Sequence, residues 1–188
     1  QRLIELMVGR PIESEFPKHA ATRGRERLRV AGLTKRDVVH DVSFSAYGGE
    51  VLGFAGLTGA GRTETMRLVF GADTPDAGQV YVDGIPVRIR HPRDAIRHRI
   101  CLLTEDRKSQ GLILQHSVRH NFGLPNLDRL RRGPFLDQRR ERAELSRYIR
   151  ELKIRVTSQE QPAATLSGGN QQKVVLAKWL AKNADILI

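Results

Sequence analysis

The fold is decided by the stretch Gly56-Leu57-Thr58-Gly59-Ala60-Gly61-Arg62-Thr63. An apolar run at residues 51–55 precedes this turn, and residues 62–70 after it read as a helix that ends at Gly71. A strand, a glycine-rich turn and a helix in this order are typical of a phosphate-binding loop. Glycines let successive backbone N–H groups converge on one anion, and the helix N-terminus adds partial positive charge. The sequence therefore predicts a phosphate site here.

The turn fits the pattern G-x-x-x-x-G-K-[ST] with one departure, because arginine stands at the lysine position. The residues that would hold the nucleotide are Gly56, Gly59, Ala60, Gly61, Arg62 and Thr63, and the Thr63 hydroxyl would face Mg²⁺. A planar guanidinium can hold phosphate but does not reproduce the compact ammonium of lysine. We therefore expect nucleotide binding with impaired or absent turnover. A turn that is rich in glycine for steric reasons alone is the simpler alternative, and the cation and hydroxyl that end the turn disfavour it.

Length and composition set broad limits on what the chain can be. The 188 residues, 39% of them hydrophobic, suit one ordinary domain, and no apolar run is long enough for a membrane span or signal peptide. The net charge of +11 permits contact with nucleic acid or an anionic membrane surface, but the basic residues are dispersed among acidic ones, which favours a solvated basic surface. Cys101 lies in an apolar run and is expected to be buried. His116 and His120 lack a third ligand, so no metal site is expected there.

The two ends of the chain suggest a fragment. The first residue is Gln1, and the last residues, 186–188, form an apolar run that we expect to be a core strand without partners. Residues 1–27 combine a short helix-like segment with a polar stretch, which predicts the tail of a preceding domain and a linker. The domain itself is expected from residue 28 to residue 188.

Within that domain the patterns predict an α/β fold in which a small antiparallel part surrounds a parallel, nucleotide-binding part. The expected strands are residues 28–30, 42–46, 51–55, 80–82, 87–89, 100–103 and 184–188, with a hairpin turn at Asp83-Gly84. The expected helices are residues 62–70, 92–97, 137–153 and a segment that follows Ser167 and ends near Asn183. Residues 112–165 hold no convincing long strand and are expected to be a mostly helical insertion.

A second glycine-rich motif, Leu166-Ser167-Gly168-Gly169-Asn170-Gln171-Gln172-Lys173, lies at the start of the last expected helix. A serine hydroxyl and free backbone N–H groups at a helix N-terminus form an anion site. An ordinary serine cap followed by glycines would read the same way. The position of the motif, after both the phosphate loop and the helical insertion, favours the anion site.

The two motifs together resemble the ATPase domain of ABC transporters, whose defining motif is Leu-Ser-Gly-Gly-Gln. More narrowly, the chain resembles the second, C-terminal ATPase domain of bacterial sugar-import ATP-binding proteins of the ribose, galactose, xylose and arabinose type. The stretches that carry this resemblance are residues 3–10, 49–56, 59–64, 92–96, 105–108, 111–112 and 170–173. The resemblance implies a P-loop NTPase domain of the ABC type, with residues 112–165 as its helical subdomain, incomplete at its C-terminus.

The resemblance also implies roles for single residues. The phosphate loop would be the Walker A motif, Glu105 would stand at the Q-loop glutamine, and ATP with Mg²⁺ would be the cofactors. Two domains of this family sandwich two nucleotides, so Ser167, Gly168 and Gly169 would contact the γ-phosphate of ATP held by the opposite domain. The whole ABC motif comprises Leu166, Ser167, Gly168, Gly169, Asn170 and Gln171.

Several features depart from the family pattern. Arg62 replaces lysine, Glu105 replaces glutamine, and residues 34–38 lack the usual adenine-stacking aromatic, for which Tyr47 is misplaced. The Walker B Asp-Glu pair and the switch histidine would follow Ile188, so no catalytic residue is expected within the chain. Hydrolysis needs a held Mg²⁺ and a residue that positions water. We therefore expect ATPase activity only in a longer protein.

The function that the resemblance implies is the ATP-binding part of a monosaccharide importer, peripheral on the cytoplasmic face of the bacterial inner membrane. Its partners would be the first ATPase domain of the same protein or a dimer mate, the membrane permease subunits and, indirectly, a periplasmic sugar-binding protein, with no nucleic acid. A soluble twin-ABC factor of the ribosome is one alternative, which Arg62, residues 105–108 and Asn170 disfavour. An inactive truncated product is the other.

Overall fold

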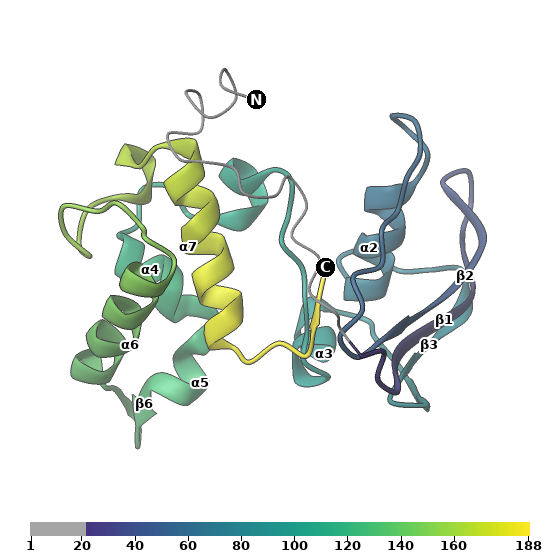
Figure 1. Ribbon diagram of the computed structural model, residues 1–188, viewed down its shortest axis with the longest axis horizontal. Coiled ribbons are helices and arrows are strands. Elements are labelled where there is room, and N and C mark those ends of the chain that lie inside the picture. The colour runs from purple at the N-terminus through teal and green to yellow at the C-terminus, as the bar shows by residue number, and fades with distance from the viewer. Residues whose placement is uncertain (1–21) are drawn as a thin grey trace.

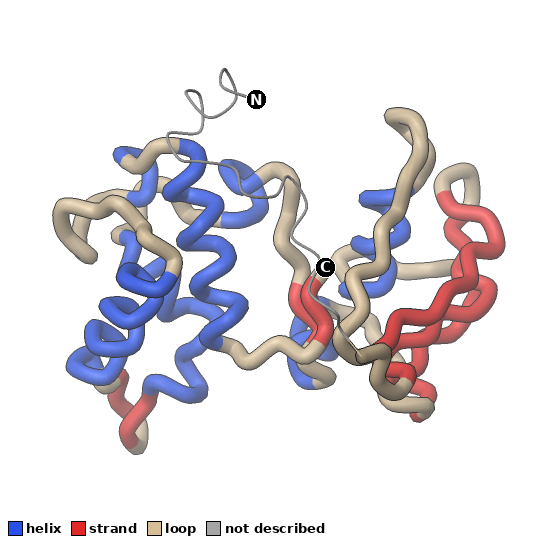
Figure 2. Tube along the Cα trace, viewed as in Figure 1, coloured by secondary structure: helices blue, strands red, loops and turns tan. Residues whose placement is uncertain are grey.

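The structure is a computed structural model that describes residues 22–188; the expectations for residues 1–21 lie outside the described residues. The described residues form two parts around two hydrophobic cores, a sheet-containing part and a helical part (Figures 1 and 2). The partly buried Trp179 packs against both cores, and its ring lies edge-on to Phe70 with centroids 6.3 Å apart. One aromatic contact therefore helps to join the two parts.

The first part is built on a four-stranded antiparallel sheet with strand order β2-β1-β3-β4. Its strands are β1 Glu26–Lys35, β2 Val39–Tyr47, β3 Ala77–Val82 and β4 Ile85–Val87. The predicted hairpin is confirmed, because Val82 pairs with Ile85 across a turn in which Asp83 and Gly84 both have positive φ, 50° and 79°. This left-handed pair is what a two-residue hairpin turn requires.

Helix α2, Arg62–Phe70, packs its buried face on this sheet and ends at Gly71, as the sequence predicts. Leu68 and Val69 from α2 share the core with Leu33 and Val80 from the sheet. Helix α3, Pro92–Arg97, and strand β5, Ile100–Cys101, complete this part. The phosphate-loop helix is thereby fixed on the sheet through its apolar face.

The prediction of a strand at residues 51–55 is wrong. These residues form an irregular, exposed segment, with Val51 98% and Phe54 40% exposed. A strand needs neighbours for its backbone N–H and C=O groups, and within the described residues no strand pairs with this segment. Residues 51–55 therefore have the apolar side chains of a buried strand but not its backbone pairing.

The parallel part is smaller than expected and consists, in the part of the chain that is described, of one strand pair. Strand β8, Ile186–Leu187, pairs with β5 through Ile100 with Ile186 and Cys101 with Leu187. The expectation that residues 186–188 lack partners is therefore wrong, because the Ile188 N–H also donates to the Cys101 carbonyl at 2.9 Å.

The second part is mostly helical, as predicted for residues 112–165, and contains one short hairpin. Its elements are η1 Arg107–Gly111 (a single π turn), α4 Val118–Gly123, η2 Leu124–Asn126, α5 Leu127–Leu130, β6 Arg131–Arg132, β7 Phe135–Leu136, α6 Gln138–Glu151, η3 Ala163–Thr165 and α7 Gly168–Ala181. The predicted Asp137 cap of α6 is confirmed, because its carboxylate accepts from the Arg140 N–H at 3.0 Å. Among the described residues, no helix combines the length and apolarity needed to cross a membrane.

An ion pair is buried inside the helical part. The Arg119 guanidinium bonds the Glu141 carboxylate, whose side chain is only 1% exposed, and also Glu160 at 2.7 Å. Gly123 leaves the space that the Glu141 carboxylate fills, because a Cβ there would collide with it. Arg119 therefore joins α4 to α6 and to the loop that leads toward α7.

We predict that Glu141→Gln lowers the free energy of unfolding by about 1–3 kcal/mol, because the buried Arg119 guanidinium then loses one of its two carboxylate partners. The matched control is Glu151→Gln on the same helix. Its ion pair with Arg147 is half exposed, so its loss should change the free energy of unfolding by less than about 0.5 kcal/mol. Urea unfolding followed by circular dichroism measures both. Equal losses would contradict the account of the buried pair.

Cys101 is fully buried, as predicted, and burial raises the pKa of its thiol to about 11. Because the thiolate is the reactive form, we predict that a disulfide reagent at pH 8 titrates no thiol in the native chain and the single thiol in urea. Rapid labelling of the native chain would contradict the placement of this strand.

Candidate functional site

The turn before α2 combines two left-handed glycines with an uncapped helix start. Gly59 and Gly61 have φ of 82° and 76°, in the left-handed region, which glycine adopts at no steric cost. Both the N–H and the hydroxyl of Thr65 donate to the Gly61 carbonyl, at 2.8 and 2.7 Å. No side chain caps α2, so the backbone N–H groups of its first turn stay available to a ligand.

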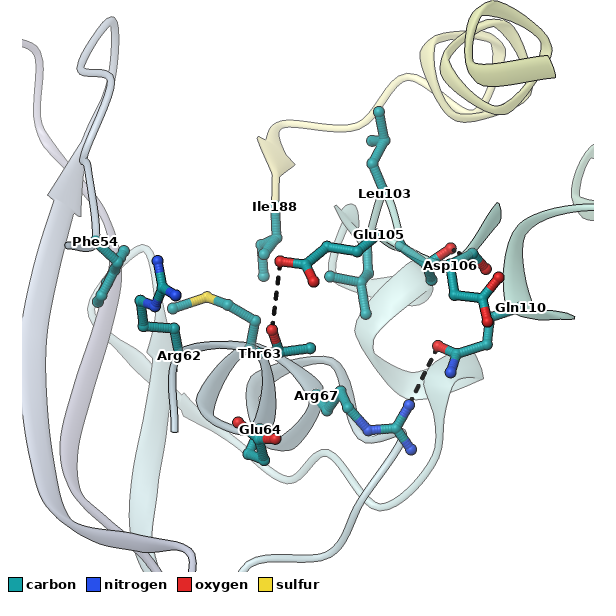
Figure 3. Close-up of a pocket in the computed structure, with 13 residues that line it drawn as sticks. Phe54, Arg62, Thr63, Glu64, Arg67, Leu103, Glu105, Asp106, Gln110 and Ile188 are labelled. Atoms are coloured by element: carbon teal, nitrogen blue, oxygen red, sulfur yellow. Dashed lines mark hydrogen bonds between the residues drawn. The ribbon is translucent and has the colours of Figure 1, made fainter. Parts of the chain in front are cut away.

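A cavity of about 600 Å³ lies beside this helix start. Figure 3 shows the side chains that line it, drawn from α2, from the segment after β5 and from the C-terminal residues. The Thr63 hydroxyl donates to the Glu105 carboxylate at 3.5 Å, and the Arg67 guanidinium donates to the Gln110 side chain at 3.3 Å. The structure thus brings together Thr63 and Glu105, which are far apart in the sequence.

Charged groups of both signs line this cavity: Arg62, Glu64 and Arg67 come from α2, and Glu105 and Asp106 come from the segment after β5. Arg67 also donates to Asp73 at 2.6 Å, and this hydrogen bond holds the pKa of Asp73 below its usual value. Arg62 is exposed and its side chain folds against Gly56, within 3.8 Å of the place where a Cβ would stand. The arginine at the lysine position therefore lies at the loop rather than pointing away from it.

The turn between β1 and β2 approaches the phosphate loop. A Cβ on Gly61 would stand 3.0 Å from the Val38 carbonyl oxygen, so the two loops touch. Residues 36–38 of this turn contain no aromatic side chain. Tyr47 ends β2, where the Arg23 guanidinium covers its ring at 3.6 Å, so it is engaged elsewhere.

The second motif lies at the start of α7, as predicted. Ser167 is the N-cap residue, but its hydroxyl makes no capping bond and instead accepts from the Asn170 amide at 3.0 Å. The Asn170 carbonyl oxygen accepts from the Arg155 N–H at 2.9 Å. Ser167 and Gly169 are exposed, whereas Leu166 is 7% exposed and anchors the motif in the helical core. The motif therefore presents a hydroxyl and uncapped N–H groups to solvent.

The two motifs belong to different parts of the molecule. Helix α2 packs in the core of the sheet-containing part and α7 packs mainly in the core of the helical part (Figure 1). The residues that line the cavity at α2 include Thr63 and Glu105 and none of residues 166–171. Within the described chain, the second motif does not complete the site of the first.

Two further side chains take part in this region, and sequence reasoning left them unassigned. Arg107 donates through Nε to the Gln171 side chain at 3.2 Å, and Lys178 donates to the Gly111 carbonyl. Burial lowers the pKa of Lys178 to about 8. In the sequence, residues 105–108 are distinguished only by the family resemblance, which does not predict these contacts.

The family model described as "ABC transporter" matches residues 39–188, which is most of the chain. The chain belongs to the ABC transporter family.

Curated relatives of this ABC-family chain are similar over almost all of it. It is 52% identical to the "Ribose import ATP-binding protein RbsA" of Geobacillus kaustophilus (strain HTA426), over 99% of the chain and 38% of the relative. It is 50% identical to the "Putative ribose/galactose/methyl galactoside import ATP-binding protein 1" of Burkholderia lata (strain ATCC 17760 / DSM 23089 / LMG 22485 / NCIMB 9086 / R18194 / 383), over 98% of the chain and 36% of the relative. The chain therefore spans less than two fifths of the length of these relatives.

Solved structures confirm the fold class. The ATP-binding cassette MJ0796, described as a dimeric post-hydrolysis state bound to ADP and Pi, superposes with a TM-score of 0.70 at 20% identity, over 85% of this chain and 72% of that one. The ADP conformation of MJ1267, a cassette of an ABC transporter, gives 0.66 at 20% identity, over 86% of this chain and 67% of that one. The ABC-type P-loop NTPase fold predicted from the sequence is confirmed.

A resident metal cluster is not seen in the described part of the ABC-family chain. Residues 22–188 contain no group of three or more His, Cys, Asp and Glu side chains placed to hold an ion. The rings of His116 and His120 lie 6.0 Å apart, centroid to centroid, and within residues 22–188 they belong to no such group.

We predict that Gly61→Ala destabilises the fold by about 1–2 kcal/mol, because alanine in the left-handed region is strained and its methyl would press on the Val38 carbonyl. The matched control is Gly169→Ala, where no atom lies within 4 Å of the new methyl and a helical position gains up to about 1 kcal/mol. Chemical unfolding of both variants measures the difference. A gain in stability for both would contradict the loop geometry.

Proposed function

We propose that this chain is the second ATPase domain of an ATP-binding protein that energises the import of a monosaccharide. Support comes from the 52% identity to a protein named for ribose import and from the similarity over 99% of this chain to 38% of that relative. A domain of this size repeated within a longer protein would account for that share. The permease subunits, the periplasmic sugar-binding protein and the location at the cytoplasmic face of the inner membrane belong to the same proposal.

The first part of the proposal concerns the chain's own loop. Residues Gly56, Gly59, Ala60, Gly61, Arg62 and Thr63 would bind the phosphates of ATP through the uncapped N–H groups before and within the first turn of α2. The Thr63 hydroxyl and Glu105 carboxylate would hold Mg²⁺, and they suit it because both are hard oxygen ligands that face each other across 3.5 Å. Mg²⁺ supplies neutralisation of phosphate charge when it is bound.

Arg62 makes this site a binding site rather than an efficient hydrolytic one. A guanidinium is broad and planar, so it cannot enter the loop as a lysine ammonium does. Its side chain already lies against Gly56 at the edge of the loop. We therefore assign the more important contribution of the chain to its second motif.

The observation that carries the proposal is the start of α7, where Ser167 and Gly169 are exposed and no side chain caps the helix. These groups do not line the chain's own cavity, so an anion bound there would be held by another domain. The first ATPase domain, or a dimer mate, would supply that nucleotide. The dimer of MJ0796 described with ADP and Pi supports such an assembly.

We predict that Ser167→Arg, in the full protein with its permease subunits in proteoliposomes, lowers ATP hydrolysis and sugar uptake at least about tenfold, because the bulky cation fills the anion site. The matched control is Ala143→Arg, which adds the same charge at an exposed position of α6 and should leave both rates within about twofold of wild type.

Wild-type rates in the Ser167→Arg protein would overturn the role of this motif. Salt-sensitive co-sedimentation of the wild-type protein with ribosomes, together with absent uptake, would favour the soluble twin-ABC alternative instead. Uptake that is lost in Ser167→Arg and kept in Ala143→Arg supports import.

A further inference from the structure

One short segment bonds to both helices that carry the motifs. Residues 105–111 follow β5 and include the π turn η1; we call them the strap. On one side, the Thr63 hydroxyl and the Arg67 guanidinium donate to Glu105 and Gln110 of the strap. Figure 3 shows both bonds reaching from α2 to the strap. The strap is therefore held by the helix that starts at the phosphate loop.

On its other side the strap packs along one face of α7. Arg107 donates to Gln171, a Cβ on Gly111 would stand 3.2 Å from the Val175 side chain, and Lys178 donates to the Gly111 carbonyl. Gln171, Val175 and Lys178 are four and three residues apart, which is the spacing of one helix face. The strap therefore follows α7 over about two turns.

The contact closest to the second motif is made by Arg107. A Cβ built on Gly168 would stand 2.5 Å from Arg107 Nη2, so the guanidinium occupies the space that any side chain at this position would need. Gln171 is 4% exposed, accepts from Arg107 and donates to the Ala163 carbonyl at 3.1 Å. Arg107, Gly168 and Gln171 thus form a packed unit directly behind the exposed Ser167.

The contact places a positive charge beside the start of α7. A cation beside a helix N-terminus opposes the helix dipole, and within the described residues Arg107 forms no ion pair that would compensate. The hydrogen bond from the charged guanidinium to Gln171 outweighs this small cost. The contact therefore fixes the first turn of α7, which carries the second motif, against the strap.

We propose that Arg107 is a positioning residue, which sets the height and orientation of the first turn of α7 so that Ser167, Gly168 and Gly169 meet the γ-phosphate of the partner-bound nucleotide. This rests on the proposed function. Arg107 itself does not touch the nucleotide in this account. It acts through Gln171 and the backbone of Gly168.

The test uses the full protein with its permease subunits and compares three variants. Arg107→Ala should lower kcat for ATP hydrolysis about tenfold with KM for ATP changed less than about twofold, because the interaction matters only when the site closes. Arg107→Lys keeps a cationic donor at this position, so its kcat should be only about threefold below wild type, between wild type and Arg107→Ala. The matched control is Arg139→Ala in the first turn of α6, an exposed arginine, which should behave as wild type.

A double-mutant cycle tests the route through the glutamine. Gln171→Met keeps the volume but cannot accept from Arg107, so it should lower kcat by itself. The double variant Arg107→Ala with Gln171→Met should then be no slower than the slower single variant, since both remove the same contact. Multiplying effects would overturn the proposed route.

Other outcomes would also overturn the proposal. Arg107→Ala with unchanged kcat would do so, and so would a fall in kcat that is matched by a lower unfolding midpoint and is not rescued by Arg107→Lys, which is the pattern of a merely structural residue. The Ser167→Arg variant distinguishes failure of the positioning role of Arg107 from failure of the proposed function. If it loses activity while Arg107→Ala does not, only the positioning role fails; if it keeps activity, the proposed function fails.

Discussion

The backbone N–H groups at the start of α7 are the constraint on which the account depends. Ser167 bonds Asn170 instead of capping the helix, so the first turn keeps its donors and the positive end of its dipole facing solvent. The same holds for α2 after Gly61. By contrast, α6 is capped by Asp137. Both helices that carry the glycine-rich motifs thus start open to an anion.

The division into two cores decides what these open helix starts can do. Each helix is fixed on its own core, and the contacts that connect the parts include Trp179 against Phe70, the β5–β8 pair and residues 105–111. A cavity forms at α2 without any residue of the second motif. For this reason we propose that the nucleotide of the second motif is held by a partner domain.

Features with a local cause could be predicted from the sequence. The helix at residues 62–70, the Asp83-Gly84 turn and the Asp137 cap depend on residues close in the chain, and all three are confirmed. The strand at residues 51–55 was wrong because pairing depends on a distant neighbour that the pattern does not reveal. The pairing of β8 and the contacts of Thr63 with Glu105 and of Arg107 with Gln171 join residues far apart. Only the folded chain specifies them.

The most direct test of the central claim is photolabelling of the full protein with an ATP analogue that carries an azide on its γ-phosphate. Trypsin separates the two motifs into the peptides 37–62 and 156–173. The account predicts that the label appears on peptide 156–173 and persists when Thr63→Ala disables the chain's own loop. Label confined to peptide 37–62, or label on 156–173 that disappears with Thr63→Ala, would contradict it.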